Sequence, residues 1–140
     1  MVTVEIKNQQ KKIPLSPARI SRIVNAILSR ERIRRANLSI VFVTDQKIRA
    51  LNKKYLHRMY ATDVLAFDLR DRKSASALEG EIVISTGAAC RQARQFKTTP
   101  QREVTLYVVH GILHLLGYDD HRPADIRKMR SKEKELMELL

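Results

Sequence analysis

The segment from Thr99 to Leu116 constrains the fold of this chain more than any other part of its 140 residues. Thr99 is a good helix N-cap, and Pro100 follows at the first helical position, where proline is favoured. Apolar side chains then occupy nearly every side of the expected helix, namely Val104, Tyr107, Val108, Val109, Ile112, Leu113 and Leu116. Because a helix that is apolar all round has to be buried, we predict that this helix lies at the centre of the domain.

Strands and helices are intermixed along the rest of the chain without strict alternation. Alternating or continuous apolar residues predict strands over residues 2–7, 38–43, 64–69 and 80–84. Capping residues and amphipathic spacing predict further helices that begin near residues 16, 44, 85 and 123. Residues 70–79 are polar and small, which predicts a surface loop. We therefore predict one α+β domain over residues 1–140, in which about five helices pack on a single mixed sheet.

The spacing within these further helices also predicts which side chains face the core. The predicted buried faces are Ile20, Ile23, Val24, Ile27 and Leu28 in the first helix, Ile48, Leu51 and Tyr55 in the second, Cys90, Ala93 and Phe96 in the third, and Ile126, Met129, Leu136 and Leu140 in the last. We expect these faces to complete the core around the central helix.

The composition narrows the range of partners. Lys and Arg number 27 against 15 Asp and Glu, which gives a net charge of +12 and a sequence pI of about 10.3. A domain this basic favours a polyanion, and nucleic acid is the commonest one in a cytosol. Aromatic residues make up only 5% of the chain and Trp is absent, so we expect contacts with phosphates rather than base stacking.

Other features of the sequence bear on the compartment. Cys90 is the one cysteine, so it cannot form a disulfide within the chain. No uninterrupted apolar run approaches the roughly 20 residues that a membrane helix needs. The first residues alternate between apolar and polar, as in a strand and not as in a signal peptide. We therefore expect a cytoplasmic protein that does not associate with membranes.

Potential metal ligands follow one another at the end of the central helix. His110 and His114 are four residues apart, so their imidazoles share one helix face and can reach a common point. Gly117 can adopt the left-handed conformation that ends a helix and turns the chain back. Asp119, Asp120 and His121 follow directly. Two helical histidines and a third ligand after the turn predict a zinc site with an open fourth position, which is the catalytic form.

The residue after the first histidine separates this pattern from that of the zinc peptidases. Those enzymes carry a glutamate at this position, and it acts as the general base. This chain has Gly111 instead. The spacing therefore predicts a hydrolytic metal site that lacks the usual peptidase base.

Several segments carry motifs in a specific order. Residues 49–55 are Arg-Ala-Leu-Asn-Lys-Lys-Tyr, and residues 62–67 are Thr-Asp-Val-Leu-Ala-Phe. Residues 80–85 are Gly-Glu-Ile-Val-Ile-Ser, and residues 110–121 are His-Gly-Ile-Leu-His-Leu-Leu-Gly-Tyr-Asp-Asp-His. Together these segments resemble the YbeY family of bacterial endoribonucleases, whose motifs are Arg-x-x-Asn-x-x-Tyr, Thr-Asp-Val-Leu-Ser-Phe, Gly-Asp-Ile-x-Ile-Ser and His-Gly-x-Leu-His-Leu-x-Gly-Tyr-Asp-His.

The resemblance implies a zinc-dependent endoribonuclease that cuts single-stranded RNA in ribosomal RNA maturation and ribosome quality control. It also implies a four-stranded mixed sheet flanked by helices, one Zn²⁺ per chain on His110 and His114, and RNA of the small ribosomal subunit, but no DNA, as partner. Arg49 corresponds to the family's functional arginine, and its guanidinium can clamp the scissile phosphate. We expect the RNA to be bound by Arg49, Lys53, Lys54 and Arg58.

The third metal ligand is open between two neighbouring residues. Where the family has its third histidine, this chain has Asp120, and His121 follows one position later. Asp120 can bind in the unshifted register, since a carboxylate oxygen binds zinc at about the same distance as an imidazole nitrogen. Alternatively, the loop bulges by one residue and His121 binds. The family pattern has a methionine at the spacing of Met129 from Asp120, so we favour Asp120.

Other functions fit parts of the pattern. A zinc peptidase fits the histidine spacing but is disfavoured by Gly111 and by the basic charge. A ribosome-associated RNA-binding factor with a structural metal fits the charge, and its RNA binding would not depend on the metal. A hydrolase of nucleotides or other small molecules fits the charge less well. The proton acceptor is open between Asp119, whichever of Asp120 and His121 does not bind the metal, and the 2′-hydroxyl of the RNA. The sequence does not determine the oligomeric state.

Overall fold

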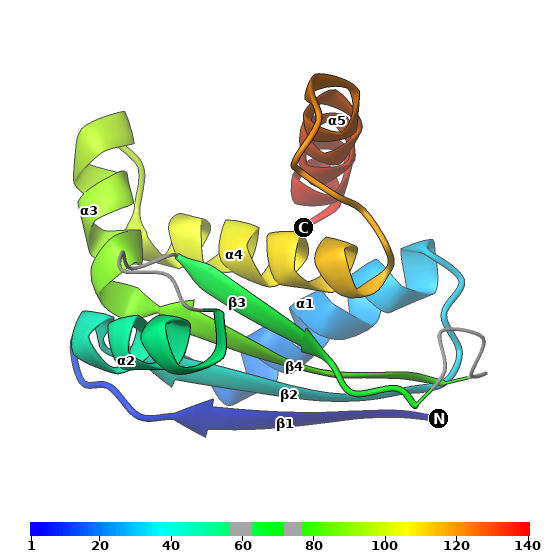
Figure 1. The fold of residues 1–140 in the computed structure, drawn as a ribbon, viewed down its shortest axis with the longest axis horizontal. Helices are drawn as coiled ribbons and strands as arrows, with labels where there is room; N and C mark the ends of the chain where they lie inside the picture. The colour runs from blue at the N-terminus through cyan, green and yellow to red at the C-terminus, as the bar shows by residue number, and fades with distance from the viewer. Residues whose placement is uncertain (57–62, 72–76) are drawn as a thin grey trace.

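The computed structural model describes residues 1–56, 63–71 and 77–140, without the side chains of Tyr55 and Leu56. Within these residues the elements follow one another as β1 (Val2–Asn8), α1 (Pro17–Arg30), β2 (Ala36–Val43), α2 (Asp45–Leu56), β3 (Val64–Asp68), β4 (Leu78–Ser85), α3 (Thr86–Phe96), α4 (Pro100–Leu115) and α5 (Pro123–Leu139) (Figure 1). The predicted α+β class with a four-stranded mixed sheet and five helices is confirmed for the described residues.

The sheet has the strand order β1-β2-β4-β3. Strands β1, β2 and β4 run parallel to one another, and β3 lies antiparallel to β4 at one edge. In this register Ile40 of β2 and Ala66 of β3 flank Ile82 of β4. Because β2 and β4 are the inner strands, their second halves are buried on both faces, which accounts for their nearly continuous apolar sequences.

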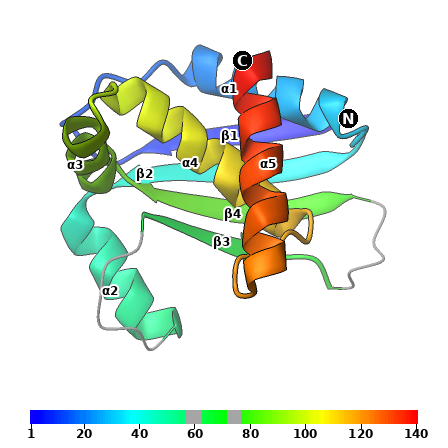
Figure 2. The ribbon, with the colours of Figure 1, turned by 90° about the horizontal axis from the view of Figure 1, so that it is seen from above.

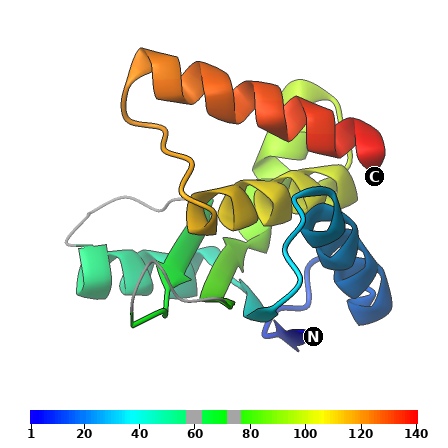
Figure 3. The same ribbon diagram turned by 90° about the vertical axis from the view of Figure 1, so that its right-hand side faces the viewer.

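Helices cover the two faces of the sheet unequally. Helices α1 and α4 pack on one face, and α3 and α5 pack against α4. Figure 2 shows α5 crossing over α4, and Figure 3 shows α5 as the outermost layer on that side. Helix α2 covers the other face, where Ile48 packs with Val41, Val83 and Leu65. The larger core therefore lies between the sheet and α4.

Helix α4 is the buried centre of the domain, as predicted. Its apolar side chains, among them Val108, Val109, Ile112 and Leu113, are fully buried. The Thr99 hydroxyl accepts a hydrogen bond of 3.1 Å from the Arg102 N–H, which confirms the predicted N-cap. Ser16 caps α1 in the same way through the Arg19 N–H.

The end of α4 is a Schellman motif. The Tyr118 N–H donates to the Leu113 carbonyl at 3.0 Å, and the Gly117 N–H donates to the His114 carbonyl at 3.1 Å. Gly117 has a φ of +100°, a conformation that favours glycine. The chain therefore reverses at the glycine, as the sequence predicts, and passes back across the end of α4.

Some predicted burial is wrong. Phe96 is 61% exposed and Leu140 is 41% exposed, although helical spacing places both on buried faces. Helix α3 ends at Phe96 and stands clear of α4 there (Figure 1), and α5 ends before Leu140. Helical spacing identifies a face, but it does not say how far along the helix another element covers that face.

Smaller differences concern partial burial and the strand ends. Leu51, Cys90 and Ile126 are only partly buried, and the predicted burial of Tyr55 falls outside the described side chains. Leu78 falls in the predicted loop, but it is buried and opens β4, because it pairs with Ala36 of β2.

No helix among the described residues is both long and apolar enough to span a lipid bilayer.

Candidate active site

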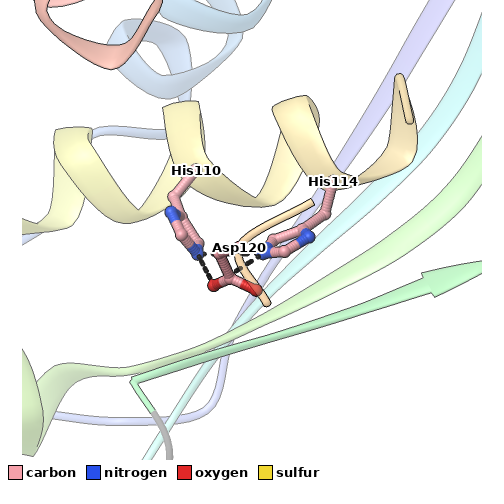
Figure 4. Close-up of side chains that lie close together, drawn as sticks. All are labelled: His110, His114 and Asp120. Atoms are coloured by element: carbon pink, nitrogen blue, oxygen red, sulfur yellow. Dashed lines mark hydrogen bonds and ion pairs between the residues drawn. The ribbon is translucent and has the colours of Figure 1, made fainter. Parts of the chain in front are cut away.

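The end of α4 and the loop after it bring potential metal ligands together (Figure 4). The Nε2 atoms of His110 and His114 lie 3.0 Å apart. Asp120 Oδ2 lies 3.7 Å from His110 Nε2 and 3.5 Å from His114 Nε2. The reversal at Gly117 makes this possible, because it returns the chain to α4 within a few residues. We call His110, His114 and Asp120 the ligand group.

The separations within the ligand group fit a tetrahedral metal ion. With bonds of 2.0–2.1 Å to zinc, two ligand atoms of a tetrahedral site are about 3.3 Å apart. The observed distances of 3.0, 3.5 and 3.7 Å lie on either side of that value. Two imidazoles and one carboxylate are also donor types that zinc binds well. The residues therefore fit Zn²⁺ with three protein ligands.

His114 has the charge state that a metal ligand needs. Burial lowers the pKa of its imidazole, and the neighbouring His110 lowers it further. Asp120, Asp119 and a hydrogen bond with the Tyr118 backbone offset part of this effect. The imidazole is therefore neutral at neutral pH, which leaves a ring nitrogen able to bind a metal ion.

His121 lies outside the ligand group. Its side chain is 72% exposed, and its Nε2 lies 3.4 Å from Asp119 Oδ1. Asp119 also accepts a hydrogen bond of 2.7 Å from the Asp120 N–H. Asp119, Asp120 and His121 form a second, exposed set of possible ligands. The geometry therefore brings Asp120, and not His121, to the two helical histidines.

A cleft of about 470 Å³ opens beside the ligand group. The start of β3 forms one wall through Asp63, Val64, Leu65 and Ala66, and α4 forms another through Leu106, Tyr107, His110 and His114. Asp120, His121 and Glu133 complete its lining. The cleft thus gives a substrate access to the ligand group.

Asp63 differs from the other described carboxylates that line this cleft. Asp120 belongs to the ligand group and Glu133 contacts His110, whereas Asp63 does neither. Burial raises the pKa of the Asp63 carboxyl, and the Tyr107 hydroxyl offsets part of the rise. Burial, together with the charge of Asp63, also raises the pKa of the Tyr107 hydroxyl, which stays protonated. A carboxyl with a raised pKa is suited to take up a proton.

An ion pair and a hydrogen bond join the start of α2 to α3 and to the end of β4. Asp45, the first residue of α2, accepts a hydrogen bond of 2.6 Å from the Ser85 hydroxyl and pairs with the Arg91 guanidinium. A Cβ at Gly87 would overlap the Asp45 carboxylate, so the Asp45 side chain would have to shift. Hydrogen bonding with Arg91 lowers the pKa of Asp45 despite its partial burial.

Gly111 faces the sheet and not the cleft. A Cβ at this position would lie 2.6 Å from Ile82 Cγ2, and Ile82 is fully buried in β4. Gly111 does not line the cleft. A carboxylate at position 111 would therefore point into the core, so the site has no room for the glutamate of a zinc peptidase.

Among the predicted RNA-binding residues, the three that the structure describes lie apart from the cleft. Arg49, Lys53 and Lys54 are exposed on α2, and none of them lines the cleft. Helix α2 covers the face of the sheet opposite to α4. Arg58 lies outside the described residues. The structure therefore does not bring Arg49 to the ligand group.

Two carboxylates of the cleft, Glu133 and Asp63, are not predicted from the sequence. His110 Nδ1 lies at a hydrogen-bond distance of 2.8 Å from Glu133 Oε2, across 23 residues of sequence. A signal existed, because helical spacing puts Glu133 on the same side of α5 as Met129 and Leu136, where an acidic residue is unusual. Asp63 lies inside a recognised motif, but nothing in that motif points to a cleft carboxylate.

The fold and the cleft define a class of protein: an α+β domain with two histidines and a carboxylate gathered at the end of a buried central helix. A sequence model of the family described as "Endoribonuclease YbeY" matches residues 5–140. The chain belongs to this family, so the resemblance seen in its motifs is confirmed.

Individual relatives agree with this assignment. A protein of Syntrophus aciditrophicus described as "Endoribonuclease YbeY" is 35% identical over 144 residues, which cover 99% of this chain and 90% of the relative. A protein of Anaeromyxobacter dehalogenans with the same description is 50% identical over 101 residues. The matched residues make up 72% of this chain but only about half (52%) of that relative. A solution structure from Thermotoga maritima has a TM-score of 0.65 at 25% identity, over 99% of this chain and 87% of that one, and confirms the fold.

Proposed function

We propose that this protein is a zinc-dependent endoribonuclease that cuts single-stranded RNA in ribosomal RNA maturation and ribosome quality control. The observation that carries the proposal is the ligand group beside an open cleft, in a chain that belongs to an endoribonuclease family. The net charge of +12 supports a polyanionic substrate. We further propose that it acts in the cytoplasm on RNA of the small ribosomal subunit.

The ligand group would hold the metal through His110 Nε2, His114 Nε2 and a carboxylate oxygen of Asp120. When bound there, Zn²⁺ supplies Lewis acidity towards a phosphodiester and towards water. The carboxylate of Asp120 adds a negative charge that a third histidine would not bring. His114 is neutral without the metal, so it need not lose a proton before binding it.

Asp63 is our candidate for the proton acceptor. It lines the cleft with the ligand group, and burial raises its pKa towards the range in which a carboxylate exchanges protons efficiently. Asp119 is a weaker candidate, because it does not line the cleft. In this role an oxygen of Asp63 would take the proton from the hydroxyl or water that attacks the phosphorus.

The cations of α2 would bind the flanking RNA and not the scissile phosphate. Arg49, Lys53 and Lys54 lie on the far side of the sheet from α4, and β3 is the edge strand between the two faces. A single strand that leaves the cleft past β3 could reach these side chains, which belong to the described part of the predicted RNA-binding set. A stiff duplex follows such a bend less easily, which supports the preference for single strands.

Cleavage assays with and without zinc test the proposed function. The purified protein should cut single-stranded RNA more readily than double-stranded RNA, lose this activity with a chelator and regain it with Zn²⁺, and leave casein intact. His114→Ala, purified identically to control for contaminating nucleases, should be inactive. Cleavage that persists in this variant or in the chelated protein would refute the proposal. RNA binding without cleavage, unchanged by the chelator, would favour the binding-factor alternative.

A further inference from the structure

We infer that Glu133 of α5 is a positioning residue for the metal site. Its carboxylate holds His110 in the tautomer that carries the proton on Nδ1, and so directs Nε2 towards His114 and Asp120. The inference deepens the proposed function, on whose metal site it rests. It also gives the C-terminal helix a part in a site that the sequence motif confines to α4 and its loop.

The contact between His110 and Glu133 has the geometry of a strong hydrogen bond. His110 Nδ1 lies 2.8 Å from Glu133 Oε2, and the two side chains are only 27% and 15% exposed. An ionised carboxylate can only accept, so the proton between them belongs to Nδ1. The opposite nitrogen, Nε2, then carries the lone pair, and it is the atom that faces the rest of the ligand group.

The core holds Glu133 in place. Met129 and Leu136, one turn before it and one turn after it on α5, are buried where α5 packs against α4. The glutamate therefore lies on the packed side of the helix, and its side chain has few other directions available. A carboxylate placed in this way can fix the orientation of a ring, as carboxylates behind metal-binding histidines commonly do.

Glu133 is not part of a surface ion-pair network. Among the described residues, no lysine or arginine forms an ion pair with its carboxylate, whereas the adjacent Lys132 pairs with Glu31 at 3.0 Å and with Glu135 at 2.7 Å. The negative charge of Glu133 therefore acts mainly on His110. It makes the imidazole a stronger electron donor at Nε2.

The contact also links metal binding to the docking of α5. A metal ion favours the His110 orientation that Glu133 supports, and that support requires α5 to be packed on α4. Metal binding therefore favours the docking of α5 on α4, and the docking of α5 favours metal binding, by thermodynamic linkage.

Two variants and a matched control test the inference without RNA. Glu133→Ala should weaken zinc binding by about 10–100-fold, measured by competition with a chromophoric chelator, and Glu133→Gln should lie near the lower end of that range, since an amide oxygen still accepts from Nδ1–H. Glu138→Gln, an exposed change on the same helix, should bind zinc like the wild type. In the zinc-free protein, ¹⁵N NMR should show His110 protonated on Nδ1 in the wild type and a mixture of tautomers in Glu133→Ala.

The outcomes separate this inference from the proposed function. Zinc affinity of Glu133→Ala within twofold of the wild type, or an unchanged His110 tautomer, would overturn the inference, whether or not the protein cuts RNA. If the alanine variant does not fold, unchanged zinc affinity in Glu133→Gln overturns it instead. If Glu133→Ala binds zinc more weakly and shows mixed tautomers, but the wild type cuts no RNA, the inference is supported and the nuclease activity is refuted. A wild type that binds no zinc overturns both.

Discussion

Replacing Gly111 by alanine tests how closely α4 lies on the sheet, and hence why a peptidase glutamate has no place here. The added Cβ would lie 2.6 Å from Ile82 Cγ2, and 3.1 and 3.2 Å from Cδ1 and Cγ1 of the same side chain. Ordinary carbon contacts are about 3.5–4.0 Å, so Ile82 or the helix has to shift. Ile82 is 0% exposed on an inner strand, which leaves it little space to move into.

Two effects of opposite sign set the magnitude. Alanine stabilises a helix interior by about 1 kcal/mol relative to glycine. Overpacking a core costs about 1–3 kcal/mol. We therefore expect Gly111→Ala to lower the free energy of unfolding by about 0–2 kcal/mol. At a helical position with open space beside it, the same change would raise that free energy.

A double-mutant cycle separates the two effects. Ile82→Ala removes the three atoms nearest to the new Cβ, and by itself should cost about 2–5 kcal/mol. In that background Gly111→Ala should become stabilising, so that the coupling between the two changes is about 1–3 kcal/mol. Urea unfolding of the zinc-free proteins measures all four corners of the cycle.

One pattern of results would refute this reasoning. If Gly111→Ala stabilises the otherwise unchanged protein by about 1 kcal/mol and the two changes are additive, then position 111 is not packed against β4. Packing against Ile82 would then not keep a peptidase glutamate out of this position.

Further expectations concern the ligands and the charged groups. Asp120→Ala should lose high-affinity zinc binding in a chelator competition and His121→Ala should keep it; the reverse would move the third ligand to His121. Asp63→Asn should slow RNA cleavage by about 10²–10⁴-fold. The free energy of unfolding of this variant, relative to that of the wild type, should rise as the pH increases above about 4. The reason is that the pKa of Asp63 is raised in the folded state, so its ionisation destabilises the wild type. Unchanged cleavage would exclude Asp63 as the acceptor. The Asp45 pKa is lowered, so Arg91→Gln should reduce the free energy of unfolding at neutral pH, by less than about 1 kcal/mol for so exposed a pair. This loss should fade as the pH falls below the ordinary value of 3.8 for Asp45; a loss independent of pH would argue against the ion pair.

Much of the fold was predictable because its signals are local. The caps at Ser16 and Thr99 and the stop at Gly117 each depend on residues within one or two helical turns. The apolar character of α4 was enough to predict that it is central. Phe96 and Leu140 were predicted wrongly because their exposure depends on where a neighbouring element ends, which is not a local property.

The sequence by itself determined the pair of histidines, the turn after them and the absence of a glutamate at position 111, since each follows from spacing along one helix. Only the tertiary structure decided that Asp120, and not His121, meets the pair, because one residue of difference in a loop changes which side chain points inwards. It alone also brought Asp63, just before β3, and Glu133 of α5 to the cleft. These contacts depend on how the helices and the sheet pack, and that packing is set by the whole core.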